Sequence, residues 1–192
     1  MELCLYLFNN EKLYEVLKEV ADCGCKVTVY SIPLEGYDDK HSMPIISHKE
    51  HRKIGEFTKY DLAVSLYNKI ATDSLPNFQL RIVPHIYLRS ERVSPFSRGE
   101  MPYSLHCKSF LLKTRSGLTY EGVTSSNFAV RDKEKHELAA VFQLEKKEVE
   151  AASDFYLGLY ENSIPLGEFK EKGDYTKFQI KEQKNIKNNC KL

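Results

Sequence analysis

The sequence predicts an α/β fold in which a mixed sheet is sandwiched between helices, and two observations carry this prediction. An apolar run, a helical pattern and a β-branched run follow one another within residues 2–33, as in a βαβ unit with two parallel strands. Further on, two strand-like runs flank the turn-forming residues 114–117, which predicts an antiparallel hairpin. The length suits one domain over residues 1–165, followed by a C-terminal tail or arm over residues 166–192.

The first elements alternate between strand and helix. Residues 2–8 form a short apolar run that ends at Asn9 and Asn10, both good helix caps. Gly24 ends the helical pattern, and residues 26–33 predict the second strand of the unit. The apolar stripe of the helix between them consists of Leu13, Val16, Leu17, Val20 and Ala21.

A long polar segment, residues 34–58, separates this unit from a second helix. Residues 78–88 then predict one strand, in which Pro84 indicates an edge position or a bulge. The stripe of the second helix is Leu62, Leu66 and Ile70.

The hairpin is expected to pair residues 103–112 with residues 118–124, and residues 137–144 are expected to form one more buried strand. A last helix follows this strand, and no internal repeat is visible. The buried side of that helix is expected to carry Val149, Ala152, Phe155 and Leu159.

Composition narrows the functional classes. The net charge is +1, so a nucleic-acid partner would have to be held by a local basic patch. No apolar stretch is long enough to span a bilayer, and the N-terminus is typical of a strand rather than a signal peptide. Five cysteines, without a second pair to complete Cys23 and Cys25, indicate reduced thiols and no zinc site. We therefore expect a cytoplasmic protein without a membrane partner, metal or cofactor.

One predicted strand carries an unusual pair of side chains, His106 and Lys108. Side chains two apart on a strand share a face, so the imidazole and the ammonium are expected side by side. Cys107 would then turn to the opposite face, and we expect it to be a core thiol.

The hairpin partner of this strand leads directly into Ser125 and Asn127, and Glu137 opens the next strand. These groups suit a phosphodiester site, because ammonium and amide groups stabilise charge on the non-bridging oxygens. A histidine can attack phosphorus or protonate the leaving oxygen, and a carboxylate can orient the imidazole. The alternative is a chance pair on an exposed strand beside ordinary turn residues.

The stretches HCK, TSSNF and HELAAVF together resemble the signature of the phospholipase D superfamily, over roughly residues 1–160. That signature is His-x-Lys, then a Gly/Ser-Ser-x-Asn-Phe turn, then an acidic residue opening a strand. Two positions depart from it: Lys113 stands where the family has Asp, and Thr124 stands where Gly is usual. His51 and Lys53 have the His-x-Lys spacing, but no Ser-x-Asn turn follows them.

The resemblance implies a phospholipase D-like fold and metal-free phosphodiester cleavage through a phosphohistidine. One histidine attacks phosphorus, and a second protonates the leaving group. Since the chain has a single complete motif, the resemblance also implies a homodimer in which two copies of the motif meet. The implied catalytic residues are His106, Lys108, Ser125, Asn127 and Glu137.

A nuclease acting on DNA or RNA is the leading expectation, because two basic loops could follow a nucleic-acid backbone. A phospholipase or phosphatidyl transferase is a second possibility, and a non-catalytic module that binds nucleic acid or protein is a third. The loops are otherwise read as solvated charge. Their candidate substrate-binding residues are Lys49, Arg52, Lys53, Arg89, Arg92 and Arg98.

Overall fold

The computed structural model describes residues 1–32, 53–54, 57–83, 86–89, 100–103, 105–129 and 135–168. Two neighbouring pairs in its central sheet are parallel and the other four are antiparallel, so the sheet is mixed, as predicted. The sheet has seven strands in the spatial order β10 (Ala139–Gln143), β9 (Thr119–Thr124), β8 (Ser109–Lys113), β1 (Glu2–Cys4), β2 (Val27–Ser31), β5 (Phe78–Ile82) and β11 (Ile164–Pro165).

The expected βαβ unit is present. The helix α1 (Glu11–Asp22) connects β1 to β2, and these two strands are parallel. Asn10 caps the helix, because its side chain accepts a hydrogen bond from the backbone N–H of Leu13 at 3.2 Å. The helix ends before Gly24, whose φ of 86° is readily adopted only by glycine.

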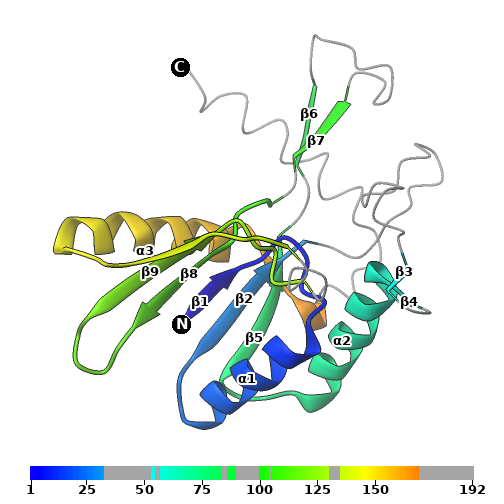
Figure 1. The fold of residues 1–192 in the computed structure, drawn as a ribbon, viewed down its shortest axis with the longest axis horizontal. Coiled ribbons are helices and arrows are strands. Elements are labelled where there is room, and N and C mark those ends of the chain that lie inside the picture. Colours follow the sequence, from blue (N-terminus) through cyan, green and yellow to red (C-terminus); the bar gives the residue numbers. More distant parts are fainter. Residues whose placement is uncertain are drawn as a thin grey trace.

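Helices cover both faces of the sheet, which confirms the predicted sandwich (Figure 1). The helices α1 and α2 (Lys59–Asp73) pack on one face, where Val29 and Leu80 join their core. The helix α3 (Lys146–Glu161) packs on the other face, where Tyr156 contacts a smaller core that contains Tyr30. Alternation of side chains along β2 explains why neighbouring residues belong to different cores.

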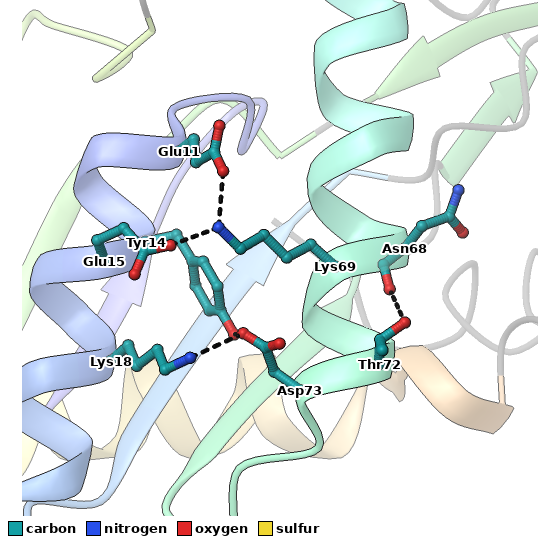
Figure 2. A network of polar contacts seen from close by, with 8 residues as sticks. All are labelled: Glu11, Tyr14, Glu15, Lys18, Asn68, Lys69, Thr72 and Asp73. Atoms are coloured by element: carbon teal, nitrogen blue, oxygen red, sulfur yellow. Dashed lines mark hydrogen bonds and ion pairs between the residues drawn. The ribbon is translucent and has the colours of Figure 1, made fainter.

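A salt-bridge and hydrogen-bond network joins α1 to α2 (Figure 2). Tyr14 donates a hydrogen bond from its hydroxyl to Oδ2 of Asp73 at 2.8 Å, and Lys18 Nζ donates to the same oxygen at 3.1 Å. Lys69 lies 2.7 Å from Oε1 of Glu11 and 2.6 Å from Oε1 of Glu15. The bonds from Tyr14 and Lys18 lower the pKa of Asp73.

The expected single strand over residues 78–88 is wrong. The strand β5 ends at Ile82 and pairs on both sides, with β2 and β11, so it is not an edge strand. A separate strand, β6 (Ile86–Arg89), pairs with β7 (Glu100–Tyr103) in a two-stranded sheet. Proline at position 84 has no backbone N–H to continue a ladder, which accounts for the division. A further small sheet pairs β3 (Lys53–Ile54) with β4 (Phe57–Thr58).

The expectation of a buried strand over residues 137–144 is also wrong. Among the described residues, the strand β10 pairs only with β9 and forms an edge of the sheet. Its apolar side chains are exposed: Leu138 just before it by 82%, Val141 by 60% and Phe142 by 53%. The apolar sequence was correct evidence for a strand, but it does not distinguish a buried strand from one whose apolar side chains are exposed.

The last helix differs from the prediction at one position. Ala152 and Tyr156 are buried against the sheet, and Val149 and Leu159 are half-buried. Phe155 is instead 44% exposed, because the buried face continues from Ala152 to Tyr156, four positions on, and Phe155 lies beside that face.

The boundary between a domain at 1–165 and an arm at 166–192 stays a prediction. Leu166, at this boundary, is buried in the core under α1 and α2, and residues 169–192 lie outside the described part of the chain. Within the described ranges, no helix combines the length and the apolar character that a bilayer crossing requires.

Candidate functional site

Three segments of the chain meet at one end of β8, β9 and β10. They are the residues before β8, the residues after β9 and the residues before β10. The backbone N–H of Thr124 donates to the carbonyl of Lys108 at 3.0 Å, and the N–H of Ser125 donates to the carbonyl of Leu138 at 3.0 Å. These two bonds extend the sheet pairing beyond the strands, so the segments are held side by side.

His106 and Lys108 lie next to each other, as the sequence predicts, but not within a strand. The strand β8 begins only at Ser109, so the pair lies in the segment that leads into it. Lys108 Nζ is 2.9 Å from Nδ1 and 3.0 Å from Nε2 of His106, and it donates to the His106 carbonyl at 3.0 Å. The His106 side chain is exposed and Lys108 is half-buried, so both can meet a substrate.

Cys107 packs against the α3 side of the sheet, beside Tyr156 and the fully buried Cys4. As expected, the side chains of His106 and Cys107 lie in different surroundings: His106 is exposed, and Cys107 packs against the apolar cluster under α3. Cys107 is, however, only half-buried.

Tyr6 is a residue of the site that the sequence reading missed. Its ring meets the imidazole of His106 edge-on, with 5.0 Å between centroids and 70° between planes. Lys108 Nζ lies 6.0 Å from the centre of the same ring, within range of a cation–π contact. The available signal was its place near the end of the first apolar run, but only the pairing of β1 with β8 brings it to His106.

Ser125 and Glu137 form a second pair. Ser125 Oγ donates to Oε2 of Glu137 at 2.5 Å and accepts from the backbone N–H of Leu138 at 3.0 Å. The carboxylate was expected to orient an imidazole, and in the single chain it receives the serine hydroxyl. The pair therefore fixes the turn after β9 to the start of β10.

Thr124 has a structural use that glycine would lack. Its hydroxyl donates to the carbonyl of Leu138 at 3.0 Å and accepts from the N–H of Ser126 at 3.0 Å. The departure from the family pattern at this position is therefore compatible with an ordered turn.

The turn is also tied to α1. Ser126 Oγ accepts from the N–H of Phe128 at 3.0 Å, and Phe128 itself has a positive φ of 54°. Asn10 donates from Nδ2 to the Phe128 carbonyl at 2.9 Å while its Oδ1 caps the helix. One asparagine thus positions both the start of the helix and the end of the turn. The sequence predicted Asn10 as a helix cap but not its bond to Phe128.

Asn127 lies between these fixed points with its amide oxygen unsatisfied. Oδ1 is buried and has no hydrogen-bond partner among the described residues. A buried polar atom without a partner is uncommon and costs about 1–3 kcal/mol, so such an atom points to a missing partner. Rotation of the amide by half a turn would offer an N–H donor in the same volume.

Lys113, at the position of the family's Asp, lies at the other end of β8 from His106. Its Nζ donates to Ser153 Oγ on α3 at 3.1 Å. The side chain therefore ties β8 to α3 and does not enter the cluster around His106.

The two basic loops remain a prediction. Four of their residues, Lys49, Arg52, Arg92 and Arg98, lie outside the described parts of the chain. For Lys53 in β3 and Arg89 in β6 only the backbone is described. Among the described residues, no group of three or more His, Cys, Asp or Glu side chains could hold a metal ion.

Comparison with known proteins gives a match among solved structures only. No model of a known protein family matches the chain, and no curated protein sequence matches it. Among solved structures, the chain is similar to NucT from Helicobacter pylori, with a TM-score of 0.50 and 14% identity. The match covers 85% of this chain and 80% of NucT. At this identity the likeness shows the fold alone, and the chain therefore has an α/β fold similar to that of NucT.

Proposed function

We propose that the chain is a metal-independent phosphodiesterase of the phospholipase D type, and that its substrate is DNA or RNA. The observation that carries the proposal is the contact of the His106 imidazole with the Lys108 ammonium, 2.9 Å apart, at the end of the sheet where the Ser125–Glu137 pair also lies. The resemblance of HCK, TSSNF and HELAAVF to the phospholipase D signature supports it, and the similarity of the fold to that of NucT is consistent with it.

The chemistry follows from the groups present. His106 would attack phosphorus, the P–O bond to the leaving nucleotide would break, and an imidazolium would protonate the leaving oxygen. Lys108 Nζ and the amide of Asn127 would donate to the non-bridging oxygens, where negative charge accumulates. Water would then attack the phosphohistidine and release the product.

Two histidines are needed for this sequence, one as nucleophile and one as acid, so we propose that the enzyme is a homodimer. The exposed edge at β10 supports this arrangement, because Leu138, Val141 and Phe142 are all more than half exposed there. Such an edge offers unpaired backbone and apolar side chains to a partner. Leu138 directly follows Glu137, so a twofold contact along this edge would bring the two sites close to each other.

The exposed apolar strip at β10, formed by Leu138, Val141 and Phe142, is also the observation that favours a lipid substrate. An apolar surface beside a phosphodiester site would suit binding to a membrane surface. Co-sedimentation with anionic liposomes separates the two: a dimer that buries the strip stays in the supernatant, whereas a lipid enzyme pellets with the vesicles.

The proposed function is tested by cleavage of labelled single-stranded and double-stranded nucleic acid in excess EDTA. The variant His106→Ala removes the proposed nucleophile, and His136→Ala is the matched control, because His136 is an exposed histidine with no assigned role. We expect cleavage by the wild type and the control, and none by His106→Ala. Equal cleavage by all three would refute the site, and binding without cleavage by any of them would indicate a binding module.

A further inference from the structure

Two cysteines of the chain, Cys4 and Cys107, meet beside the candidate site. The register of β1 with β8 places Cys4 opposite Ser109, so Cys107, two residues earlier, lies diagonally across from Cys4. Both belong to the apolar cluster under α3. The two thiols lie close enough for each to shift the pKa of the other, and neither is in a disulfide.

The two sulfurs have different surroundings. Cys4 is fully buried, with 0% of its surface exposed, whereas Cys107 is half-buried. Cys107 Sγ lies 3.2 Å from Ser109 Oγ, which in turn lies 2.8 Å from the Tyr156 hydroxyl. If Tyr156 donates to Ser109, the serine proton is directed at the sulfur, and Cys107 is surrounded by donors.

These donors favour the thiolate of Cys107. The hydrogen bonds from Cys4 and Ser109, together with the charge of Lys108, lower the pKa of Cys107 well below its ordinary value, and burial opposes them. The same bond and burial raise the pKa of Cys4, which remains a thiol. A half-buried thiolate next to a protonated, enclosed thiol is the arrangement of an attacking and a resolving cysteine.

We propose that Cys107 and Cys4 form a dithiol site that a hydroperoxide oxidises to a disulfide. The Cys107 thiolate attacks the terminal oxygen of the hydroperoxide, the O–O bond breaks, and the alcohol or water leaves with a proton from solvent. Cys107 is then a sulfenic acid. Cys4 sulfur attacks that sulfur, the S–O bond breaks, and the departing hydroxide takes the proton of Cys4 as water. Two thiols and one hydroperoxide thus yield a disulfide, one alcohol or water, and one water.

The position of the disulfide gives it a consequence for the site. The backbone of Cys107 lies between His106 and Lys108, in the segment that leads into β8. A disulfide to Cys4 would pull this segment toward β1, because a disulfide permits only a narrow range of distances between the Cα atoms of the two cysteines. This consequence rests on the proposed function: the oxidised chain is expected to lose nucleic-acid cleavage and to regain it after reduction.

The experiment treats the folded chain with hydrogen peroxide, blocks remaining thiols with an alkylating reagent and maps the cysteines by mass spectrometry. We expect a cross-linked peptide pair containing Cys4 and Cys107, with alkylation retained at the exposed Cys23. In Cys4→Ala the resolving thiol is absent, so Cys107 should accumulate as a sulfenic acid that dimedone traps. In Cys107→Ser, Cys4 should stay reduced, because the oxidant cannot reach it.

A triple variant, Cys23→Ser, Cys25→Ser and Cys190→Ser, is the control, and it should form the same cross-link. Thermal unfolding of each variant verifies that it is folded. Peroxide that leaves Cys107 unmodified, or a dimedone adduct on Cys107 that persists in the wild type without a cross-link, would overturn the dithiol site. Cross-linking is read without any nuclease assay, so failure of the proposed function leaves this result intact. An oxidised chain that cleaves as fast as the reduced chain would refute only the link to His106.

Discussion

Asn10 joins two distant parts of the chain: its Oδ1 caps α1 through the N–H of Leu13, and its Nδ2 donates to the carbonyl of Phe128, 118 positions away. The second bond holds the turn that contains Ser125 and Asn127 against the start of the helix. A single polar side chain therefore connects the N-terminal βαβ unit to the candidate site.

Replacement of Asn10 by alanine is expected to remove both bonds. Loss of a helix cap costs about 1 kcal/mol, and an unsatisfied carbonyl adds about 1 kcal/mol. Asn10→Asp is the informative partner, since it keeps the capping oxygen but loses the N–H donor to Phe128. In urea unfolding, the wild type should be the most stable, Asn10→Asp should be intermediate and Asn10→Ala should be the least stable. If Asn10→Asp were as stable as the wild type, the bond to Phe128 would contribute nothing.

Lys108 is expected to stabilise charge on the phosphate. Removal of one such donor typically lowers kcat by about 100- to 1000-fold, so Lys108→Ala should show this loss with little change in KM. Lys113→Ala is the control at the position where the family has Asp, because its ammonium bonds Ser153 on α3 and lies away from His106. Steady-state cleavage assays compare the two, and an equal loss for both lysines would show that the assignment is not specific.

The edge at β10 is expected to hold the dimer. Val141→Asp would bury an unpaired carboxylate in the interface, which costs several kcal/mol and should raise the dimer dissociation constant by about 100-fold or more. Val16→Asp is a matched control, since Val16 is 55% exposed against 60% for Val141 and lies on α1.

Sedimentation velocity measures both valine variants. The Val141 variant should be a monomer without cleavage, and the Val16 variant should resemble the wild type. A dimer that survives the charge at Val141 would place the interface elsewhere.

The contact between α1 and α2 is expected to weaken in acid. The pKa of Asp73 is lowered in the folded chain by the bonds from Tyr14 and Lys18. A carboxyl whose folded pKa lies below its unfolded value, about 3.9, contributes stability that is complete above that value. The contribution disappears as the pH falls through the folded pKa.

Asp73→Asn and Tyr14→Phe should therefore flatten the acid limb of the unfolding free energy. Tyr14→Phe removes the larger cause of the pKa shift and leaves the carboxyl in place. Chemical denaturation across the acidic range checks this, and acid limbs with unchanged slopes in both variants would contradict the assignment.

Much of the fold was predictable because local patterns agree with the tertiary structure. Leu17 and Ala21 of the stripe predicted for α1 are buried, whereas Val16 is 55% exposed and Tyr14, outside the predicted stripe, is fully buried. The turn at residues 114–117 joins β8 to β9, as predicted. The prediction failed where burial depends on partners outside the pattern. The apolar run at β10 lies at an edge of the sheet where the described residues leave it exposed.

In the candidate site, too, contacts between the ends of neighbouring strands were predictable from local patterns, and contacts that depend on tertiary pairing were not. The sequence spacing placed His106 beside Lys108 and Ser125 near Glu137, because both pairs lie where paired strands begin or end. The contribution of Tyr6 depends on the pairing of β1 with β8, which no local pattern specifies. Cys107 was expected to be an ordinary core thiol, and only the structure shows that Cys4 and Ser109 lie near it.

The covalent intermediate is the most direct test of the account. A nucleic-acid substrate labelled at the scissile phosphate is mixed with excess enzyme, quenched in alkali, in which phosphohistidine persists, and digested for peptide mapping. The account predicts the label on the peptide that contains His106, in the wild type and in His136→Ala, but not in His106→Ala. Product formation in the same quench samples without any label on His106 would contradict nucleophilic attack by this histidine.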